Sequence, residues 1–487
     1  MGAFTLDIHI HMPHTTSPTH ATHKACIIGA GSSGIACAKV LHERGIPFDC
    51  FEMGSGIGGM WRYNNDSGTS SAYCSLHINT SRDTMAYSDF PMPKDYPPFP
   101  DHALIMKYFE AYVDHFGFRD KLTFRHRVEK VEPIGDGTHL VSVVGPDGKR
   151  RTNRYGAVLV ANGHHIDPRY PTFPGEFTGR TLHSHYYRTS DGFENQRVLV
   201  VGLGNSACDI SCETARVAKT VAISTRRGAH IIPKYLFGWP MDTLLPAFLW
   251  RYVPYWILGP FVGSILYLCR GRHSWYGLPN PKHKYLHEHP TISGDILNML
   301  GHGYLRVKPD IRELAGKTVR FVDGSEEEFD VVVWCTGYHI TFPFFDKSVM
   351  NAEDNEVRLY KNVVHPNQPN LYFIGLVQPW GAIMPLAEQQ SEWMADVLEG
   401  KTGLPDRETM LREIAADRNK IARRYTHSAR HTIQVDFYPY DRLLKKLRRR
   451  GRNWAKRPLP RQPETASERK PCNALPSPVA PATTVPS

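Results

Sequence analysis

The sequence predicts an α/β protein with two parallel sheets, one built around each of two glycine-rich turns. Each turn follows a short apolar run and precedes a segment with helical periodicity. The first turn is Gly29-Ala-Gly31-Ser-Ser-Gly34, and the second is Gly202-Leu-Gly204-Asn-Ser-Ala207. One such turn is weak evidence, because glycines end many strands for structural reasons alone. Two in a single chain of 487 residues predict two Rossmann-like, dinucleotide-binding domains.

The first turn is expected to hold a nucleotide through its backbone. Its glycines permit a tight turn, close approach to a pyrophosphate and close helix packing, and the helix that follows offers free N–H groups. That helix is expected over 32–44, and the strand 48–51 after it ends at Glu52. An acid at this place accepts hydrogen bonds from the ribose hydroxyls of an adenosine cofactor without a 2′-phosphate. The first site therefore fits FAD, with contacts expected from Gly29, Ala30, Gly31, Ser32, Ser33, Gly34 and Glu52.

The second turn is followed by different chemistry. The strand 221–224 leads into Thr225, Arg226 and Arg227, and no acid follows it. Two guanidinium groups favour a 2′-phosphate through bidentate, charge-assisted hydrogen bonds, although an ordinary solvated turn would have the same sequence. The second site therefore fits NADPH. Its expected contacts are Gly202, Gly204, Asn205, Ser206, Ala207, Asp209, Thr225, Arg226 and Arg227.

The order of the segments predicts that one domain is inserted into the other. Strands are expected near 122–131 and 140–144 and at 157–160, and a buried strand at 328–334 follows the second unit. Alternating strands and helices with right-handed crossovers give parallel sheets. We therefore expect a discontinuous FAD-binding domain of 24–195 and 326–445, and an inserted NADPH-binding domain of 196–325.

A third motif lies between the two turns. Phe177, Gly179, His183 and Tyr187 form an FxGxxxHxxxY pattern. With this pattern the chain resembles the flavin-containing monooxygenase family, a branch of the class B flavoprotein monooxygenases. The resemblance covers about residues 24–440. Further matching segments are 58–61, 79–91, 204–210, 334–338, 373–379 and 387–389.

The resemblance implies both the cofactors and the reaction. In this family NADPH reduces FAD, the reduced flavin captures dioxygen as a C4a-hydroperoxide, and a small soft nucleophile takes one oxygen atom at nitrogen or sulfur. Asn79 matches the residue that contacts this adduct and the retained nicotinamide, so it is the expected catalytic residue. Ile78 departs from the small hydroxyl residue that relatives often carry there. The resemblance adds Gly59, Met60, Trp61, Asn79 and Gln378 to the expected FAD contacts.

Two other classes of enzyme share a pair of dinucleotide units. A Baeyer–Villiger monooxygenase would oxidise ketones with the same cofactors, and the Tyr187 that closes the third motif favours the heteroatom-oxidising branch over it. A flavin disulfide reductase needs a redox-active cysteine pair near the flavin, and neither turn region contains one. The resemblance gives His183 a structural role or that of a conformational relay, and not one in acid–base catalysis.

Residues 243–269 form an apolar stretch whose arrangement the sequence leaves open. No charged residue occurs from Tyr252 to Cys269, but prolines and glycines interrupt the run. A transmembrane helix, an interfacial or substrate-entry helical hairpin and a buried insertion all fit this composition. Relatives carry an apolar insertion here that contacts membranes, so the resemblance favours the hairpin.

The two ends of the chain have unusual compositions. The net charge is +10, and a basic, proline-rich tail at 446–487 is expected to be disordered, as is the histidine-rich leader at 1–23. No recognition fold accompanies the basic segment, so a nucleic-acid partner is not expected. Nine cysteines without a CxxC pair, together with a leader lacking an apolar core, fit a cytoplasmic protein. Peripheral membrane contact and a homodimer stay open.

Overall fold

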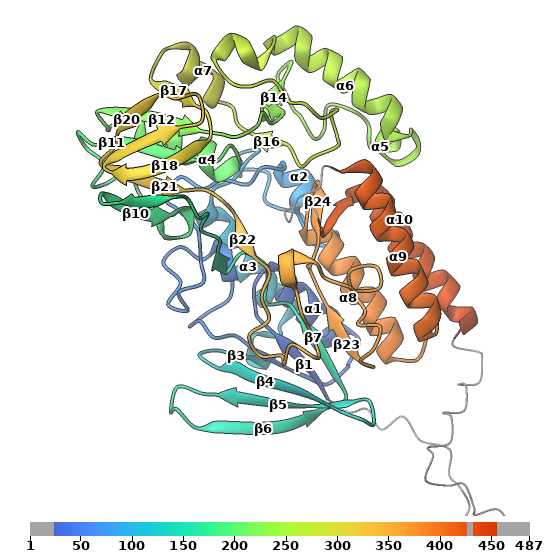
Figure 1. The fold of residues 1–487 in the computed structure, drawn as a ribbon. Coiled ribbons are helices and arrows are strands. Elements are labelled where there is room, and N and C mark those ends of the chain that lie inside the picture. The colour runs from blue at the N-terminus through green and yellow to red at the C-terminus, as the bar shows by residue number, and fades with distance from the viewer. Residues whose placement is uncertain (1–23, 426–431, 455–487) are drawn as a thin grey trace, which may run out of the picture.

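The structure, a computed structural model, describes residues 24–425 and 432–454, and two parallel sheets organise it (Figure 1). In the first sheet the strand order is β23-β7-β1-β2-β3, and in the second it is β10-β21-β11-β12-β17. The first contains β1 (Ala25–Ile28), β2 (Phe48–Phe51), β3 (Leu122–Thr123), β7 (Ala157–Val160) and β23 (Leu371–Phe373). The second contains β10 (Arg180–His183), β11 (Arg197–Val201), β12 (Thr220–Ser224), β17 (Leu305–Lys308) and β21 (Val331–Trp334). The predicted α/β class is confirmed.

The first sheet is covered on both faces, which explains the unbroken apolar sequence of its central strand. Ala25 and Ile27 of β1 pack on the face covered by α1 (Ser32–Glu43), α3 (His102–Phe116) and α8 (Met384–Leu398). Cys26 and Ile28 pack on the other face, against the antiparallel sheet of β4 (Arg127–Ile134), β5 (Thr138–Val144) and β6 (Arg150–Tyr155). Because strand side chains alternate between faces, the two sets belong to two separate cores. We call the core that α1, α3 and α8 cover the first core.

The second sheet repeats this plan with other covering elements. Val198 and Val200 of β11 face α4 (Asn205–Thr214) and α7 (Ile296–Gly301), and we call this the second core. Leu199 and Val201 face a sheet made of β9 (Gly175–Phe177), β18 (Ile311–Gly316), β19 (Thr318–Phe321) and β20 (Glu326–Glu328).

Two strands join a different sheet from the one the predicted domain boundaries imply. Both β10 and β21 fall within the segments expected to be FAD-binding, yet β21 pairs in parallel with β10 and with β11 of the second sheet. The boundaries at 195 and 326 are therefore wrong for these strands. The reason is that a four-residue apolar strand carries no sequence signal for which of two similar parallel sheets it joins. The chain crosses between the sheets at β8 (Asp167–Pro168) and β22 (Tyr338–His339), which pair antiparallel.

The apolar stretch 243–269 forms two helices on the outer edge of the molecule, α5 (Ala247–Tyr252) and α6 (Tyr255–Arg270) (Figure 1). Helix α6 buries Leu258 and Val262 but exposes Trp256 and Leu268, whose side chains are 76% and 81% exposed. A wholly buried insertion is thus contradicted. Across 24–425 and 432–454, no helix has the length and apolar character needed to cross a membrane.

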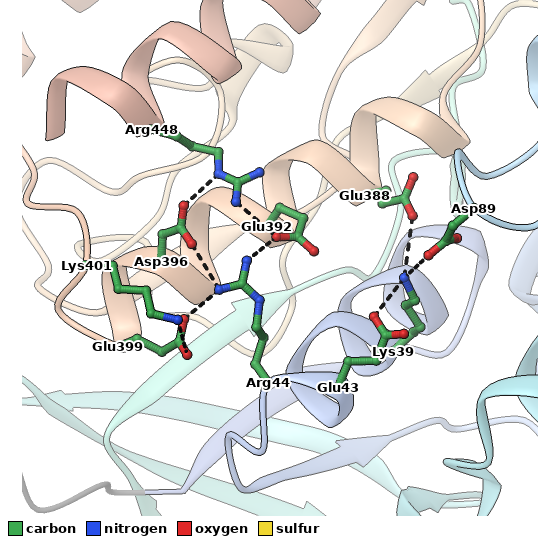
Figure 2. Close-up of polar contacts among 10 residues, drawn as sticks. All are labelled: Lys39, Glu43, Arg44, Asp89, Glu388, Glu392, Asp396, Glu399, Lys401 and Arg448. Carbon is green, nitrogen blue, oxygen red and sulfur yellow. Dashed lines mark hydrogen bonds and ion pairs between the residues drawn. The ribbon is translucent and has the colours of Figure 1, made fainter. Parts of the chain in front are cut away.

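The C-terminal helix α10 (Phe437–Trp454) extends into the segment predicted to be disordered. That prediction is wrong for 446–454, because Tyr440, Leu444 and Leu447 form an apolar stripe that is buried in the first core. Arg448 on the same helix binds Asp396 (2.6 Å) and Glu392 (3.1 Å) of α8. Figure 2 shows that Arg44, at the end of α1, pairs with the same two carboxylates. The prediction of disorder rested on composition, which does not show that apolar residues recur at helical spacing. The predicted leader 1–23 and the tail beyond 454 lie outside the described residues.

The other elements are short or peripheral. The remaining helices are α2 (Arg82–Met85) and α9 (Arg407–Arg424), with 3-10 helices at η1 (Gly59–Trp61), η2 (Arg119–Lys121), η3 (Ser184–Tyr186), η4 (His273–Tyr276) and η5 (Glu353–Asn355). The remaining strands pair as β13 (Ile231–Ile232) with β16 (Thr291–Ile292), β14 (Tyr235–Leu236) with β15 (Trp239–Pro240), and β24 (Gln378–Trp380) with β25 (Gln434–Asp436).

Candidate active site

A cavity of about 1860 Å³ is lined by residues of both glycine-rich turns. Helices α1 and α4 each begin at this cavity, and neither Gly31 nor Gly204 caps its helix with a side-chain hydrogen bond. The first-turn N–H groups of both helices, with the positive ends of their dipoles, are therefore available to a phosphate. This arrangement fits the pyrophosphate of a dinucleotide at each of the two helices.

Glycine is needed at Gly34 and at Gly31 of the first turn for two different structural reasons. A Cβ atom on Gly34 would lie 1.9 Å from the carbonyl oxygen of Gly29, so this glycine is required for the turn to pack on itself. A Cβ atom on Gly31 would lie 3.7 Å from its nearest neighbour, the Cα atom of Gly59. The protein therefore leaves a bare backbone surface between Gly31 and Gly59, and Gly59 begins η1. Such a surface is what a pyrophosphate needs to approach the main chain.

Glu52 lies at the carboxyl end of β2, as predicted, and its carboxylate is buried. Its Oε2 atom accepts a hydrogen bond from the Ala30 N–H (2.8 Å), and its Oε1 atom accepts one from the Gly54 N–H (2.8 Å). The side chain is thus fixed beside the first turn. Each oxygen keeps acceptor capacity for a ribose hydroxyl, since a carboxylate offers about four lone-pair sites.

The two predicted arginines of the second site have unlike surroundings. Arg227 forms an ion pair with Glu288 (3.0 Å), whereas Arg226 is exposed and forms no ion pair with a described residue. The Thr225 hydroxyl donates a hydrogen bond to the Arg227 carbonyl oxygen (2.7 Å), which stabilises the turn. Both arginines line the cavity. Arg226 is therefore the one with its charge available to a 2′-phosphate.

Asp209, a predicted contact of the second site, is not part of the cavity lining. It lies one turn along α4, and its Oδ2 atom accepts a hydrogen bond from the Tyr73 hydroxyl (2.5 Å). Burial raises the pKa of the Asp209 carboxyl. The sequence motif could not reveal this, because Tyr73 lies 136 residues earlier in the chain.

Asn79 lies in the cavity wall between the two turns' binding regions, half-buried, and its side-chain amide makes no hydrogen bond with the described residues. The segment leading into it crosses from the second core to the first, since Tyr73 packs in the second core and Ile78 in the first. Ala30 and Gly34, which were also predicted to contact FAD, do not line the cavity. The other predicted cofactor contacts that line the cavity are Gly29, Gly31, Ser32, Ser33, Glu52, Gly59, Met60, Trp61, Gln378, Gly202, Gly204, Asn205, Ser206, Ala207, Thr225, Arg226 and Arg227.

The cavity also contains residues that sequence reasoning missed. Arg169, next to β8, donates to the Thr336 carbonyl oxygen through Nε (3.2 Å) and Nη2 (2.9 Å), and its pKa is lowered by burial and by the nearby charge of Arg226. Burial also lowers the pKa of Lys234. The apolar stretch 243–269 contributes Trp250 and Tyr255, and the segments on either side of it contribute Met241, Asp242, Tyr285, Glu288 and His289. No sequence signal indicated Arg169, because it lies beside the two-residue strand β8, which pairs antiparallel with β22 outside both parallel sheets.

Cys335 lines this cavity and His183 precedes the lining residue Ser184, and both side chains are held neutral. His183 has a fully buried side chain, and burial lowers its pKa to about 4. Burial raises the pKa of the Cys335 thiol to about 12. At neutral pH the imidazole is therefore uncharged and the thiol is protonated, which agrees with a structural role for His183 and gives Cys335 no thiolate for redox chemistry.

Comparison with known proteins agrees with this geometry. The family model described as flavin-binding monooxygenase-like matches residues 22–449. Flavin-containing monooxygenase 5 of Rattus norvegicus is 39% identical over 439 residues, which cover 86% of this chain and 81% of that protein. Dimethylaniline monooxygenase (N-oxide-forming) 2 of Rattus norvegicus is 35% identical over 438 residues, with the same two coverages of 86% and 81%.

A solved structure extends the likeness to three dimensions. S-allyl-L-cysteine S-oxygenase from Allium sativum is 27% identical and superposes with a TM-score of 0.66, covering 89% of this chain and 92% of that one. The resemblance noted in the sequence is thus confirmed over the whole described fold. With two nucleotide-type turns on one cavity and this degree of identity, the chain belongs to the flavin-binding monooxygenase-like family.

Proposed function

We propose that the protein uses FAD at the first turn and NADPH at the second to oxygenate small soft nucleophiles at nitrogen or sulfur. As a flavin monooxygenase it takes an oxygen atom from dioxygen. The buried acid Glu52 supports FAD, and the unpaired Arg226 supports NADPH. The names of two relatives, an N-oxide-forming monooxygenase and an S-oxygenase, support reaction at a heteroatom.

The observation that carries the proposal is the place of Asn79. Its amide is free of partners among the described residues and lines the same cavity as both glycine-rich turns. When bound, the flavin supplies hydride acceptance from the nicotinamide and activation of dioxygen. The Asn79 amide can then donate and accept hydrogen bonds at the reacting centre without supplying a labile proton. Trp380, Tyr285 and Trp250 also line the cavity, and large aromatic rings leave less room there for water.

The replacement Asn79→Ala tests this role. We expect the variant to retain FAD and to oxidise NADPH, because Asn79 lies outside both glycine-rich turns. The yield of oxygenated product from a thioether or tertiary amine should fall, and hydrogen peroxide should account for the missing turnover. Losing one preorganised hydrogen bond costs about 10²-fold in the stabilised step. Product and peroxide are measured together against NADPH consumed.

Asn162→Ala is the matched control, because Asn162 also lines the cavity but donates its amide to the Thr341 carbonyl oxygen (3.2 Å). It should leave the ratio of product to NADPH close to that of the unmodified protein. An Asn79→Ala variant that stays coupled would remove Asn79 from the catalytic role. Formation of esters from ketones, with no oxidation of amines or thioethers, would replace heteroatom oxygenation with the Baeyer–Villiger reaction.

A peripheral membrane contact is proposed for the outer face of α5 and α6. Exposed side chains there include Phe248, Tyr252, Trp256, Phe261 and Leu268. Helix α10 contacts α5, and the Arg442 guanidinium lies 5.5 Å from the centre of the Tyr252 ring. Apolar side chains beside basic ones suit an anionic lipid surface. Trp256→Ser should lower co-sedimentation with anionic phospholipid vesicles, and unchanged co-sedimentation would exclude this face.

A further inference from the structure

The segment that carries Asn79 packs against the second core before the chain reaches the cavity. Tyr73 is 4% exposed in the second core, and Leu76 packs against that core as well. Ile78 and Met85 belong instead to the first core. Asn79 therefore stands at the point where the chain passes from one core to the other, and its position depends on how the two cores are held together.

One hydrogen bond at this crossing is part-buried and has a carboxylate oxygen as its acceptor. The Tyr73 hydroxyl donates to Asp209 Oδ2 (2.5 Å), and the Tyr73 ring packs at 6.1 Å against the ring of Tyr187, the last residue of the FxGxxxHxxxY motif. The backbone supports the same docking, because the Cys74 N–H donates to the Arg188 carbonyl oxygen (2.8 Å). Hydrogen bonds to charged groups are among the stronger ones in proteins.

Helix α4 links this contact to the nucleotide. Its first turn, at Asn205 and Ser206, lines the cavity at the second glycine-rich turn, and Asp209 lies about one turn further along the same helix. A helix of this length moves as a rigid rod, so a displacement of its N-terminus is transmitted to Asp209. The helix that faces the proposed NADPH phosphates is thus the helix that holds the Asn79 segment.

We propose that Asp209 is a positioning residue, which holds Tyr73 and thereby fixes the Asn79 segment against the helix that faces NADPH. This assigns to Asp209 a role other than the nucleotide contact that its motif suggested. The proposal rests on the proposed function in one respect, the role of Asn79. The Tyr73–Asp209 contact that holds the segment does not depend on the role of Asn79, and it is measured separately.

Tyr73→Phe and Asp209→Asn test the contact with little change in shape. Tyr73→Phe keeps the ring in the second core, and Asp209→Asn keeps a neutral acceptor. Ser75→Ala is the control, because the Ser75 hydroxyl donates to Glu213 Oε2 of the same helix (2.7 Å) at an exposed site. Two quantities are measured on the FAD-loaded protein: amide hydrogen exchange over residues 69–81, and the ratio of hydrogen peroxide to oxygenated product.

We expect Tyr73→Phe to raise both quantities about tenfold, the effect of losing one hydrogen bond to a charged group. Asp209→Asn should raise them less, since the amide oxygen still accepts. The double variant should match Tyr73→Phe closely, because the one side-chain hydrogen bond that Asp209 makes among the described residues is already absent in Tyr73→Phe. Ser75→Ala should leave both quantities within about twofold, as for an exposed hydrogen bond.

Exchange over 69–81 that stays unchanged in Tyr73→Phe would overturn the proposal, whatever the activity. Faster exchange with unchanged coupling would also overturn it if Asn79→Ala is uncoupled, because the segment would then move without affecting catalysis. If Asn79→Ala is itself fully coupled, the same result overturns the proposed role of Asn79 and leaves the Tyr73–Asp209 contact that holds the segment standing. If Asp209→Asn fails to fold, Tyr73→Phe alone decides.

Discussion

Arg226 and Arg227 are adjacent in the chain, but only one of them has its charge available. Glu288 neutralises Arg227 at 3.0 Å, so a phosphate would have to compete with a carboxylate for that guanidinium. Arg226 meets no such competition from the described residues and instead has the like charge of Arg169 nearby. Two guanidinium groups that approach each other without an acid between them favour an anion there.

Arg226→Ala should weaken NADPH binding about 10- to 100-fold, because each hydrogen bond to a charged group contributes roughly 1.5–3 kcal/mol. The KM for NADH should hardly change, since NADH lacks the 2′-phosphate. Arg227→Ala is the matched control and should have a smaller effect on NADPH. Steady-state kinetics with both nucleotides measure this. Equal losses of NADPH and NADH affinity in Arg226→Ala would make the residue structural.

Replacement by valine is expected to affect flavin binding at Gly31 but folding at Gly34. A Cβ atom at Gly31 meets nothing closer than 3.7 Å in the protein, whereas a Cβ atom at Gly34 would lie 1.9 Å from the Gly29 carbonyl oxygen. Gly31→Val should therefore fold but be colourless, because the valine occupies the space of the flavin pyrophosphate. Gly34→Val should lower the melting temperature or fail to accumulate. A yellow, fully loaded Gly31→Val protein would move the flavin away from this turn.

Individual side-chain roles were predictable from sequence only where a local motif sets them. The uncapped helix starts and Glu52 follow from the glycine pattern, because a strand, a turn and a helix fix their positions within about 30 residues. Asp209 belongs to the same pattern, yet its partner is a tyrosine from a distant segment. Glu288, which neutralises Arg227, is equally distant in sequence. Such pairings depend on tertiary packing, and a single sequence contains no signal for them.

Helices α1, α8 and α10 are joined by ion pairs that also reach the Asn79-to-Pro91 segment (Figure 2). The Lys39 side chain is 3% exposed, and its Nζ atom contacts Glu43 (2.9 Å), Glu388 (3.8 Å) and Asp89. Burial raises the pKa of the Glu388 carboxyl, which also accepts a hydrogen bond from the Ser88 N–H (2.9 Å). Lys39 thus anchors the end of the Asn79 segment to α1 and α8.

Lys39→Met should lower the free energy of unfolding by about 3 kcal/mol, because it leaves buried Glu388 without its cation. Lys401→Met is the control: Lys401 pairs with Glu399 (2.8 Å) but is 57% exposed, and such exposed pairs contribute about 0–1 kcal/mol. Urea unfolding of the two variants measures the difference. A Lys39→Met protein as stable as Lys401→Met would mean that protonated Glu388 is satisfied without the lysine.

Elements were predicted well where periodicity is strong and poorly where several packings suit one pattern. The strands 48–51 and 157–160 have the expected extents, and the helix after the first turn ends one residue before the expected 44, because unbroken apolar runs and helical spacing are distinctive. The sheet membership of β21 and the helical course of α10 were not predicted. An apolar tetrapeptide fits either parallel sheet, and the stripe of Tyr440, Leu444 and Leu447 is hidden among basic residues.

The molecule as a whole places two nucleotide-type turns on one cavity, with the insertion forming part of the cavity wall and presenting an apolar outer face. The two five-stranded parallel sheets and the two turns followed from the sequence. The crossing of the chain at β8 and β22 did not, because two-residue strands carry no periodicity. The structure indicates what the end of the FxGxxxHxxxY motif does, since Tyr187 and the following Arg188 contact the segment that leads to Asn79.

The central claim is that this cavity transfers one atom of dioxygen to a nitrogen or sulfur atom of a small molecule at the expense of NADPH. The most direct measurement supplies dioxygen labelled with heavy oxygen to the FAD-loaded protein with NADPH and a mixture of a thioether, a tertiary amine and a ketone. The account predicts labelled sulfoxide or N-oxide, with one labelled atom in each product molecule by mass spectrometry. Label found only in an ester of the ketone, or only in hydrogen peroxide, would contradict it.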